Sequence, residues 1–303
     1  MIGSQFTQDD HKTNQFQSLR SQLTLASSAR SEKQRHLSLV ALTQQLYEQS
    51  LNEAIETHQI LMKVLPLLLD SSSPIRKQLI DLLRYLPAHK VAADAEHISV
   101  FVRAGLTHLS AEISQDALAV FNWLLDIAAN ELVSCPGGWT KSLASFCAIL
   151  GWSSSKNAGW SVVPPKTNSQ FQDQRIAQIS TLTRLIHAGL HHELDTYDNK
   201  TCDWAQDILT SCKLSASQWP IEHVNIFCNL RSQDSEALVS REARLQEFLV
   251  SFSQCLKKGG ELARQEGGTL GRIAALLLQT MQDGLTGYQD QHRHEVDNLS
   301  SLW

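Results

Sequence analysis

The sequence predicts an all-α protein built as a HEAT- or armadillo-like α-solenoid of stacked helix pairs. Three observations predict this fold. Apolar residues recur at helical spacing along most of the chain, a helix-pair pattern repeats at about 40 residues, and no segment shows a convincing strand alternation. In HEAT and armadillo arrays each helix pair buries its apolar faces against its neighbours, which fits these patterns.

The N-terminal part is predicted to contain a short tail followed by two helices. Residues 1–13 are mostly polar, and we interpret them as a disordered tail or an expression remnant. Apolar spacing predicts a first helix over 14–27. Ser31, with Gln34 three residues later, can form a capping box that starts the next helix.

The stretch 58–69 is very apolar and is predicted to be a buried helix. Pro66 should kink its last turn, because proline removes a backbone donor and clashes with the preceding turn. Ser73 is then a plausible N-cap, with Pro74 at the first helical position. Pro87 should end that helix.

The stretch 94–126 is predicted to form two helices joined by a tight polar turn. The second helix carries a wide set of apolar positions: Ile113, Ala117, Leu118, Val120, Phe121, Trp123, Leu124 and Leu125. At 100° per residue they span an arc of roughly 220°, whereas a helix lying on one surface needs only about 100°. This helix is therefore expected to pack on two sides.

An internal repeat relates this helix pair to its predecessor. Four apolar positions of one helix recur 38 positions later (75 to 113) in the other: Ile75, Leu79, Leu83 and Leu86 match Ile113, Ala117, Phe121 and Leu124. A weaker copy relates Arg35 to Arg76, at an offset of 41 positions (35 to 76). The alternative is a helical bundle with a chance leucine spacing. Because the turn also recurs at the same place, the repeats favour a solenoid spanning 14–152.

The C-terminal half is predicted to be helical as well, after a long connection. A helix through Trp139 and Phe146 should end at Gly151, and residues 153–170 form a loop longer than most connections inside a domain. That loop is interpreted as a boundary, a mobile segment or a binding loop. The remaining segments are a helical region at 171–285, with long helices at 235–257 and 261–285 parted by Gly259-Gly260, shorter helices at 202–212 and 220–230, and a tail at 286–303.

Two groups of residues carry a resemblance to a known family. Thr107-His108-Leu109-Ser110 with Trp123-Leu124-Leu125-Asp126 resembles the core of the pre-rRNA-processing Ipi family, which includes the animal Testis-expressed-ten proteins. The segment 64–70 followed by Ile75-Arg76-Lys77 is similar to the preceding repeat of those proteins. The resemblance covers roughly residues 30 to 152, and generic HEAT repeats lack its two central motifs.

The resemblance implies a non-catalytic scaffold subunit of the Rix complex in the nucleus, in both nucleolus and nucleoplasm. In that family the protein joins a PELP-type HEAT subunit and a WD-repeat subunit on the large-subunit pre-ribosome. There the complex supports processing of the second internal transcribed spacer and, indirectly, the action of the midasin-type AAA ATPase. Family members tend to begin with a lysine-rich tail, whereas this chain opens with mostly neutral residues and Asp9-Asp10. An RNA-binding or import role of such a tail is therefore not transferred.

Composition limits the other classes of function. The chain has 303 residues, of which 42% are hydrophobic and 19% charged, which is enough for a sizeable core. Six cysteines without a C-x-x-C pair, and no signal-peptide pattern, predict free thiols in a reducing compartment. No apolar run approaches the roughly 20 residues needed to cross a bilayer, so we expect a soluble intracellular protein.

No cluster of residues predicts a catalytic, cofactor or metal site. His187, His191, His192 and Glu193 are the most metal-like group, but HAGLHHE lacks the glutamate between two histidines of a zinc-peptidase helix. The glycines of 267–272 lack the Lys-Ser/Thr pair of a phosphate loop and are better explained by close helix packing or a kink. We therefore expect no catalytic residue, cofactor or metal.

Exposed polar faces are the better candidates for function. Lys77, Arg84 and Tyr85 are predicted to form an outer ridge, while Trp152 and Trp160 lie on or beside the long loop. Aromatic and arginine side chains are favoured interface anchors, so we take these five as candidate partner-binding residues. The plainer alternative for each is a solvated helix face or a loop folded back on its own domain.

Two rival functions belong to other classes. A karyopherin-like peptide-binding adaptor would grip basic peptides in a concave groove. A helical enzyme would use the 187–193 cluster and would carry stoichiometric metal.

The charge balance generates a first prediction, which concerns RNA. With 26 Lys and Arg against 31 Asp and Glu, the net charge is −5. The isolated chain should bind RNA weakly and with a shallow salt dependence, because a steep slope requires many phosphate contacts. A salt titration of binding to labelled RNA measures this slope. Tight binding with a strongly negative slope would contradict the prediction.

Overall fold

The computed structural model describes residues 17–48, 57–152, 169–190, 238 and 240–300, and every regular element in these ranges is helical. A helix over 17–28 comes first. The N-terminal labelled elements are α2 (Glu32–Glu48), α3 (Thr57–Val64), the 3₁₀ helix η1 (Leu65–Leu69), α4 (Ser73–Arg84), α5 (Ala88–Ala93), α6 (Ala95–Leu106), α7 (Ala111–Ile127), α8 (Ala129–Ser134) and α9 (Thr140–Leu150). The C-terminal ones are α10 (Ser169–Leu190), α12 (Arg241–Glu247), the π-helical stretch η5 (Phe248–Phe252), α13 (Ser253–Gln265) and α14 (Gly268–Ser300).

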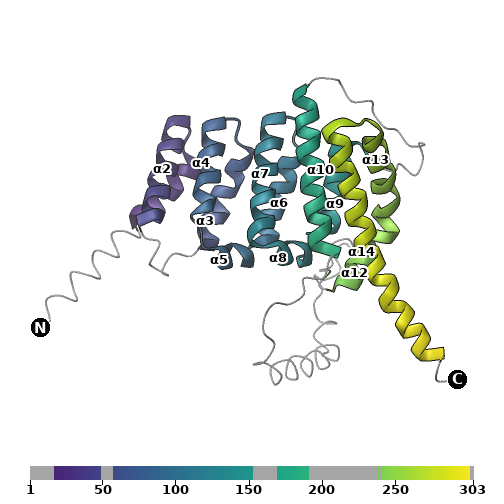
Figure 1. Ribbon diagram of the computed structural model, residues 1–303. Coiled ribbons are helices and arrows are strands. Elements are labelled where there is room, and N and C mark those ends of the chain that lie inside the picture. Colours follow the sequence, from purple (N-terminus) through teal and green to yellow (C-terminus); the bar gives the residue numbers. More distant parts are fainter. Residues whose placement is uncertain (1–16, 49–56, 153–168, 191–237, 239, 301–303) are drawn as a thin grey trace, which may run out of the picture.

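The helices stack in two layers, which confirms the predicted all-α solenoid (Figure 1). In one layer α2 packs on α4, α4 on α7 and α7 on α10. In the other layer η1 packs on α6 and α6 on α9. The short helices α5 and α8 lie along one edge of the stack, at the bottom of Figure 1. Among the described residues, none of the helices has the length and apolar character to cross a bilayer.

Proline and serine positions set the bounds of the second repeat. The apolar helix predicted at 58–69 is α3, which changes to the 3₁₀ form of η1 where Pro66 stands. The N-cap of α4 is Ser72 instead of the expected Ser73, so Pro74 is in the second helical position. Both positions lie in the first turn, where the missing proline N–H is tolerated.

Helix α7 is packed on two sides, as its wide apolar arc predicts. It contacts α6 across the layers and both α4 and α10 within its own layer. The α6 contact is close, because a Cβ at Gly105 would lie 2.7 Å from the Cβ of Ala117. Phe121 is fully buried and meets Phe146 of α9 edge-on, with ring centroids 5.4 Å apart. Trp123, at the margin of the arc, is only partly buried.

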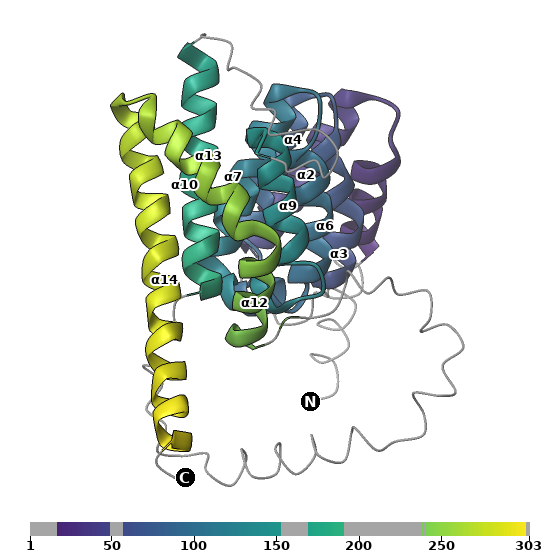
Figure 2. The ribbon, with the colours of Figure 1, turned by 90° about the vertical axis from the view of Figure 1, so that its right-hand side faces the viewer.

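The stack continues beyond the long connection. Helix α10 extends the layer of α2, α4 and α7, while α14 and α13 pack together at the end of the stack, with α14 against α10 (Figure 2). Buried tryptophan joins this end to the repeats: Trp139, at the start of α9, donates from Nε1 to the carbonyl oxygen of Arg244 at 3.1 Å. The predicted helices at 202–212 and 220–230 lie outside the described residues.

The position of the C-terminal break differs from the prediction. Helix α13 runs through Gly259 and Gly260 and ends at Gln265, and the chain turns at Gly267 and Gly268, whose φ angles are +78° and +62°. These left-handed values favour glycine, so the second glycine pair makes the turn. Helix α14 then continues to Ser300, past the end expected at 285.

Trp152 explains why a glycine lies inside α13. Its side chain is only 2% exposed, and a Cβ at Gly259 would lie 2.2 Å from Cδ2 of the indole ring. The expectation that Trp152 is an exposed interface anchor is therefore wrong, because the indole fills the space over Gly259. Trp160, the other loop tryptophan, lies outside the described residues.

Candidate functional site

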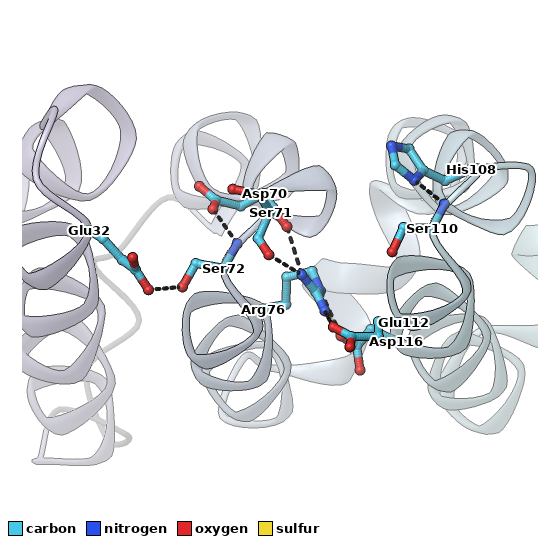
Figure 3. A network of polar contacts seen from close by, with 9 residues as sticks. All are labelled: Glu32, Asp70, Ser71, Ser72, Arg76, His108, Ser110, Glu112 and Asp116. Atoms are coloured by element: carbon cyan, nitrogen blue, oxygen red, sulfur yellow. Dashed lines mark hydrogen bonds and ion pairs between the residues drawn. The ribbon is translucent and has the colours of Figure 1, made fainter.

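A buried arginine holds the second and third repeats together (Figure 3). Arg76 of α4 is 1% exposed, and its Nε donates to Oδ2 of Asp116 on α7 at 2.7 Å. Its Nη1 donates to the carbonyl oxygens of Asp70 and Ser71 at 2.8 and 3.0 Å, and its Nη2 lies 3.4 Å from Oε2 of Glu112. The guanidinium thus connects its own helix, the preceding turn and the next helix of the layer.

The first repeat has a related arrangement. Arg35 of α2 donates from Nη1 to the carbonyl oxygen of Ala29 at 3.1 Å, and its Nη2 lies 3.0 Å from Oδ2 of Asp70. Ser72 also donates to Glu32 across the same joint. We call Arg35 and Arg76, with the carboxylates they contact, the arginine ladder. Its two arginines are separated by the 41 positions of the weaker sequence repeat (35 to 76).

The turns before α4 and α7 are built alike, which gives His108 a structural role. Asp70 Oδ1 accepts the backbone N–H of Ser72 at 2.9 Å, and His108 Nδ1 accepts that of Ser110 at 3.0 Å. The acceptor and the donor of the first turn each precede their counterparts in the second turn by 38 positions (70 to 108 and 72 to 110). The contact requires His108 Nδ1 to carry no proton, since it accepts the bond. Its geometry is that of a turn-forming residue.

The predicted outer ridge is exposed on α4. Lys77, Arg84 and Tyr85 are all exposed. The contact of Arg84 within the part of the chain that the structure describes is a 3.4 Å pair with Asp81, which is exposed too. Tyr85 lies edge-on to Tyr47 of α2, with ring centroids 5.9 Å apart. Tyr47, which is 67% exposed, was not among the predicted ridge residues, because its approach to Tyr85 depends on how α2 packs on α4. We call Tyr47, Lys77, Arg84 and Tyr85 the outer ridge.

The buried arginine of α12 serves the joint between the repeats and the C-terminal helices. Arg244 Nε donates to the carbonyl oxygen of Gly189 at 3.1 Å, and its Nη1 donates to that of Leu238 at 2.9 Å. Burial lowers the pKa of this guanidinium, while the nearby Glu242 carboxylate opposes the shift. These contacts bind the end of α10 to α12, so the role is structural.

Two buried thiols meet between α9 and α13. The Sγ atoms of Cys147 and Cys255 are 3.7 Å apart, and both residues are free cysteines. A hydrogen bond from Cys147 lowers the pKa of Cys255 to about 7, whereas that bond and burial raise the pKa of Cys147. The third described thiol, Cys135, has its pKa raised by burial. The described cysteines are thus free thiols, as predicted.

Nothing in the described ranges forms a metal-binding cluster of histidine, cysteine and acidic side chains. His187 is exposed on α10, but His191, His192 and Glu193 lie outside the described residues. The glycines of 267–272 lie in the turn and first helical turn between α13 and α14, where a phosphate loop would need a preceding strand. The buried guanidinium groups of Arg76 and Arg244 contact a carboxylate and carbonyl oxygens of neighbouring elements.

These observations define the class as a HEAT-like α-solenoid whose buried polar groups hold neighbouring helices together. Comparisons with known proteins then identify the family. Residues 89–187 match the family model described as "Rix1 complex component involved in 60S ribosome maturation". The chain is 37% identical over 292 residues to "Pre-rRNA-processing protein IPI1" of Pyricularia oryzae, covering 91% of this chain and 84% of that protein.

A second relative of the same name, from Chaetomium thermophilum, is 36% identical over 270 residues, covering 87% of this chain and 79% of the relative. A chain of a solved Rix1–Rea1 pre-60S particle aligns with 70% of this chain and 77% of its own length, at 19% identity and a TM-score of 0.45. The chain belongs to the pre-rRNA-processing Ipi family, which acts in maturation of the large ribosomal subunit. The family resemblance read from the sequence is confirmed.

The arginine ladder generates a stability prediction. Arg76→Ala should lower the free energy of unfolding by roughly 3–5 kcal/mol, because it leaves Asp116 and two turn carbonyls without their buried cation. The exposed Arg84→Ala is the control and should change it by no more than about 0.5 kcal/mol. Urea denaturation followed by circular dichroism measures both. Equal, small effects would show that the ladder does not hold α4 to α7.

The thiol pair generates a chemical prediction. Oxidised glutathione should convert Cys147 and Cys255 to a disulfide: the Cys255 thiolate attacks the glutathione disulfide, and deprotonated Cys147 then displaces the second glutathione. Because the thiolate is the nucleophile, the rate should rise as pH passes about 7. Mass spectrometry of a non-reduced digest detects the cross-link. Cys147→Ser should stop at the glutathione adduct, and a cross-link through Cys135 instead would contradict the geometry.

Proposed function

We propose that this chain is a non-catalytic scaffold subunit of the Rix complex in maturation of the large ribosomal subunit. The observation that carries the proposal is the outer ridge, which projects from a continuous stack whose buried polar groups are used in joints between helices. A rigid array that displays side chains on one face is suited to binding other proteins. Family membership supports the same role.

The partners that we propose are a PELP-type HEAT subunit and a WD-repeat subunit, assembled on the large-subunit pre-ribosome. The midasin-type AAA ATPase would be reached indirectly, through the assembled complex. This assignment rests on the family resemblance and implies a nuclear location, in both nucleolus and nucleoplasm. Processing of the second internal transcribed spacer would then be supported by assembly, without a reaction on this chain.

The outer ridge is proposed as the contact surface for these partners. Tyr47 and Tyr85 form an exposed aromatic pair across α2 and α4, and Arg84 lies beside Tyr85 in sequence with its side chain 62% exposed. Tyrosine and arginine are enriched at interface centres because they bury a large area and also form hydrogen bonds. A partner would therefore gain both apolar contact and a charge-assisted bond at this surface.

A charge reversal on the ridge tests this proposal. Arg84→Glu should reduce co-purification of the two subunits, while changing the free energy of unfolding by no more than about 0.5 kcal/mol. The matched control is Lys63→Glu, because Lys63 is exposed on α3 in the other helix layer. The readout is affinity purification from cells, with quantitation of the co-eluting proteins by mass spectrometry.

Three outcomes would contradict parts of the proposal. Full retention of both subunits by Arg84→Glu would move the contact surface away from the ridge. Equal losses with Lys63→Glu would indicate a general charge effect. Absence of both subunits from the unmutated purification would overturn the scaffold role itself.

A further inference from the structure

A groove opens between α7 and α10 at their N-terminal halves, which lie side by side in the layer (Figure 1). Its volume is about 380 Å³. Its lining combines small or apolar side chains with acids and amides: Ala111, Glu112, Gln115, Leu118, Phe171, Asp173, Gln174 and Ala177. The lining therefore includes carboxylates but no basic side chain.

The repeat explains why the groove lies at this joint. Arg35 and Arg76 occupy matching positions in α2 and α4, and the next matching position, 38 residues on (76 to 114), is Ser114 in α7. Ser114 donates to the carbonyl oxygen of Leu106 at 3.0 Å. In this it resembles the two arginines, which also donate to carbonyl oxygens that precede their own helices. A serine side chain is too short to reach the next helix as Arg76 does. The guanidinium that bridges the α4–α7 joint thus has no counterpart at the N-terminal end of the α7–α10 joint, where the groove lies; the Arg184 guanidinium bridges the other end.

The charges of the groove are suited to a cation from outside. The Glu112 side chain is 76% exposed, and its one contact within the described ranges is the 3.4 Å pair with Arg76, whose shorter bond goes to Asp116. Asp173 makes no hydrogen bond or ion pair with any part of the chain that the structure describes. Two carboxylates beside an apolar floor favour an ammonium or guanidinium group and repel phosphate.

Apolar side chains flank the same opening. Phe171, at the start of α10, is 42% exposed although it lines the groove. Leu109 is fully exposed in the turn two residues before Ala111. Exposed aromatic and aliphatic groups beside a polar rim are typical of a protein-binding surface.

We propose that the α7–α10 groove binds a basic segment of a partner protein, with an arginine or lysine next to an apolar residue. The cation contacts Glu112 and Asp173, and the apolar residue packs against Phe171 and Leu118. The partner thereby supplies the charge that Arg76 supplies at the preceding joint. The groove is separate from the outer ridge, so this proposal does not depend on the partners proposed for that surface.

Selection of peptides on the purified full-length chain tests the proposal. A random library of short peptides displayed on phage should yield sequences in which arginine or lysine neighbours an apolar residue. A synthetic, fluorophore-labelled copy of an enriched peptide is then titrated by fluorescence anisotropy. Binding should weaken as salt concentration rises, because part of the affinity is electrostatic.

Two variants locate the peptide on the chain. Asp173→Asn should weaken its binding by about ten- to a hundredfold, since it removes a charged acceptor without touching the arginine ladder. Ala177→Trp should abolish binding by filling the groove. The matched controls are Asp81→Asn on α4 and Ala119→Trp on α7, both exposed and outside the lining. The two controls should bind as the unmutated chain does.

Several results would overturn the proposal. These are a failure to enrich any peptide, enrichment of acidic or uncharged peptides, and binding that survives both Asp173→Asn and Ala177→Trp. Binding that appears only after Lys156 and Lys166 are replaced by serine would assign the groove to the chain's own 153–168 residues. Co-purification of the two proposed subunits is a separate measurement. A negative result for the groove therefore does not contradict the proposed scaffold role.

Discussion

The arrangement of the repeats depends on a buried guanidinium. Taking a charged group out of water is costly unless it is paired and hydrogen-bonded, and Arg76 meets that condition only when two turn carbonyls and Asp116 are all in place. The ion pair therefore fixes the turn before α4, the position of α4 itself and the distance to α7 at once. Apolar packing alone tolerates small shifts between helices, whereas this set of directional bonds does not.

The ladder changes chemistry where the stack approaches its C-terminal end. Between α7 and α10, Asn122 donates to Thr181 at 2.8 Å, and Arg184 of α10 reaches back to Asn122 and Asp126. The cation now comes from the later helix and lies at the opposite end of α7 from Ser114. One end of this joint is consequently closed by polar contacts, while the other end remains open as the groove.

Local sequence signals predicted the elements whose bounds depend on local chemistry. The helix changes to 3₁₀ geometry at Pro66, where a kink was predicted. Gly151 ended α9 with a φ of +70°, and the 38-residue repeat predicted the stack. Prediction failed where a distant residue decides. Gly259 looked like a helix break, but the indole of Trp152 makes it a packing position, and the same contact removes Trp152 from the surface.

The proposed binding surfaces were only partly predictable for a related reason. Exposure of Lys77, Arg84 and Tyr85 follows from helical periodicity, but their pairing with Tyr47 required the register of two helices. Arg76 carried a signal, since it matches Arg35 at the 41-residue offset of the repeat (35 to 76), yet its acceptors are known only from the fold. The groove has no sequence signature apart from a serine at an arginine position.

Under the two proposals, stability and recognition depend on different side chains of this chain. The buried arginines and the tryptophans Trp139 and Trp152 hold the helices in place, whereas the outer ridge and the groove acids add little to packing because they are exposed or weakly paired. Surface residues of this kind can change without unfolding the stack, and the ladder then keeps their spacing constant. A scaffold needs this separation. If the same side chains both formed the core and bound a partner, a substitution that improved binding would also destabilise the fold.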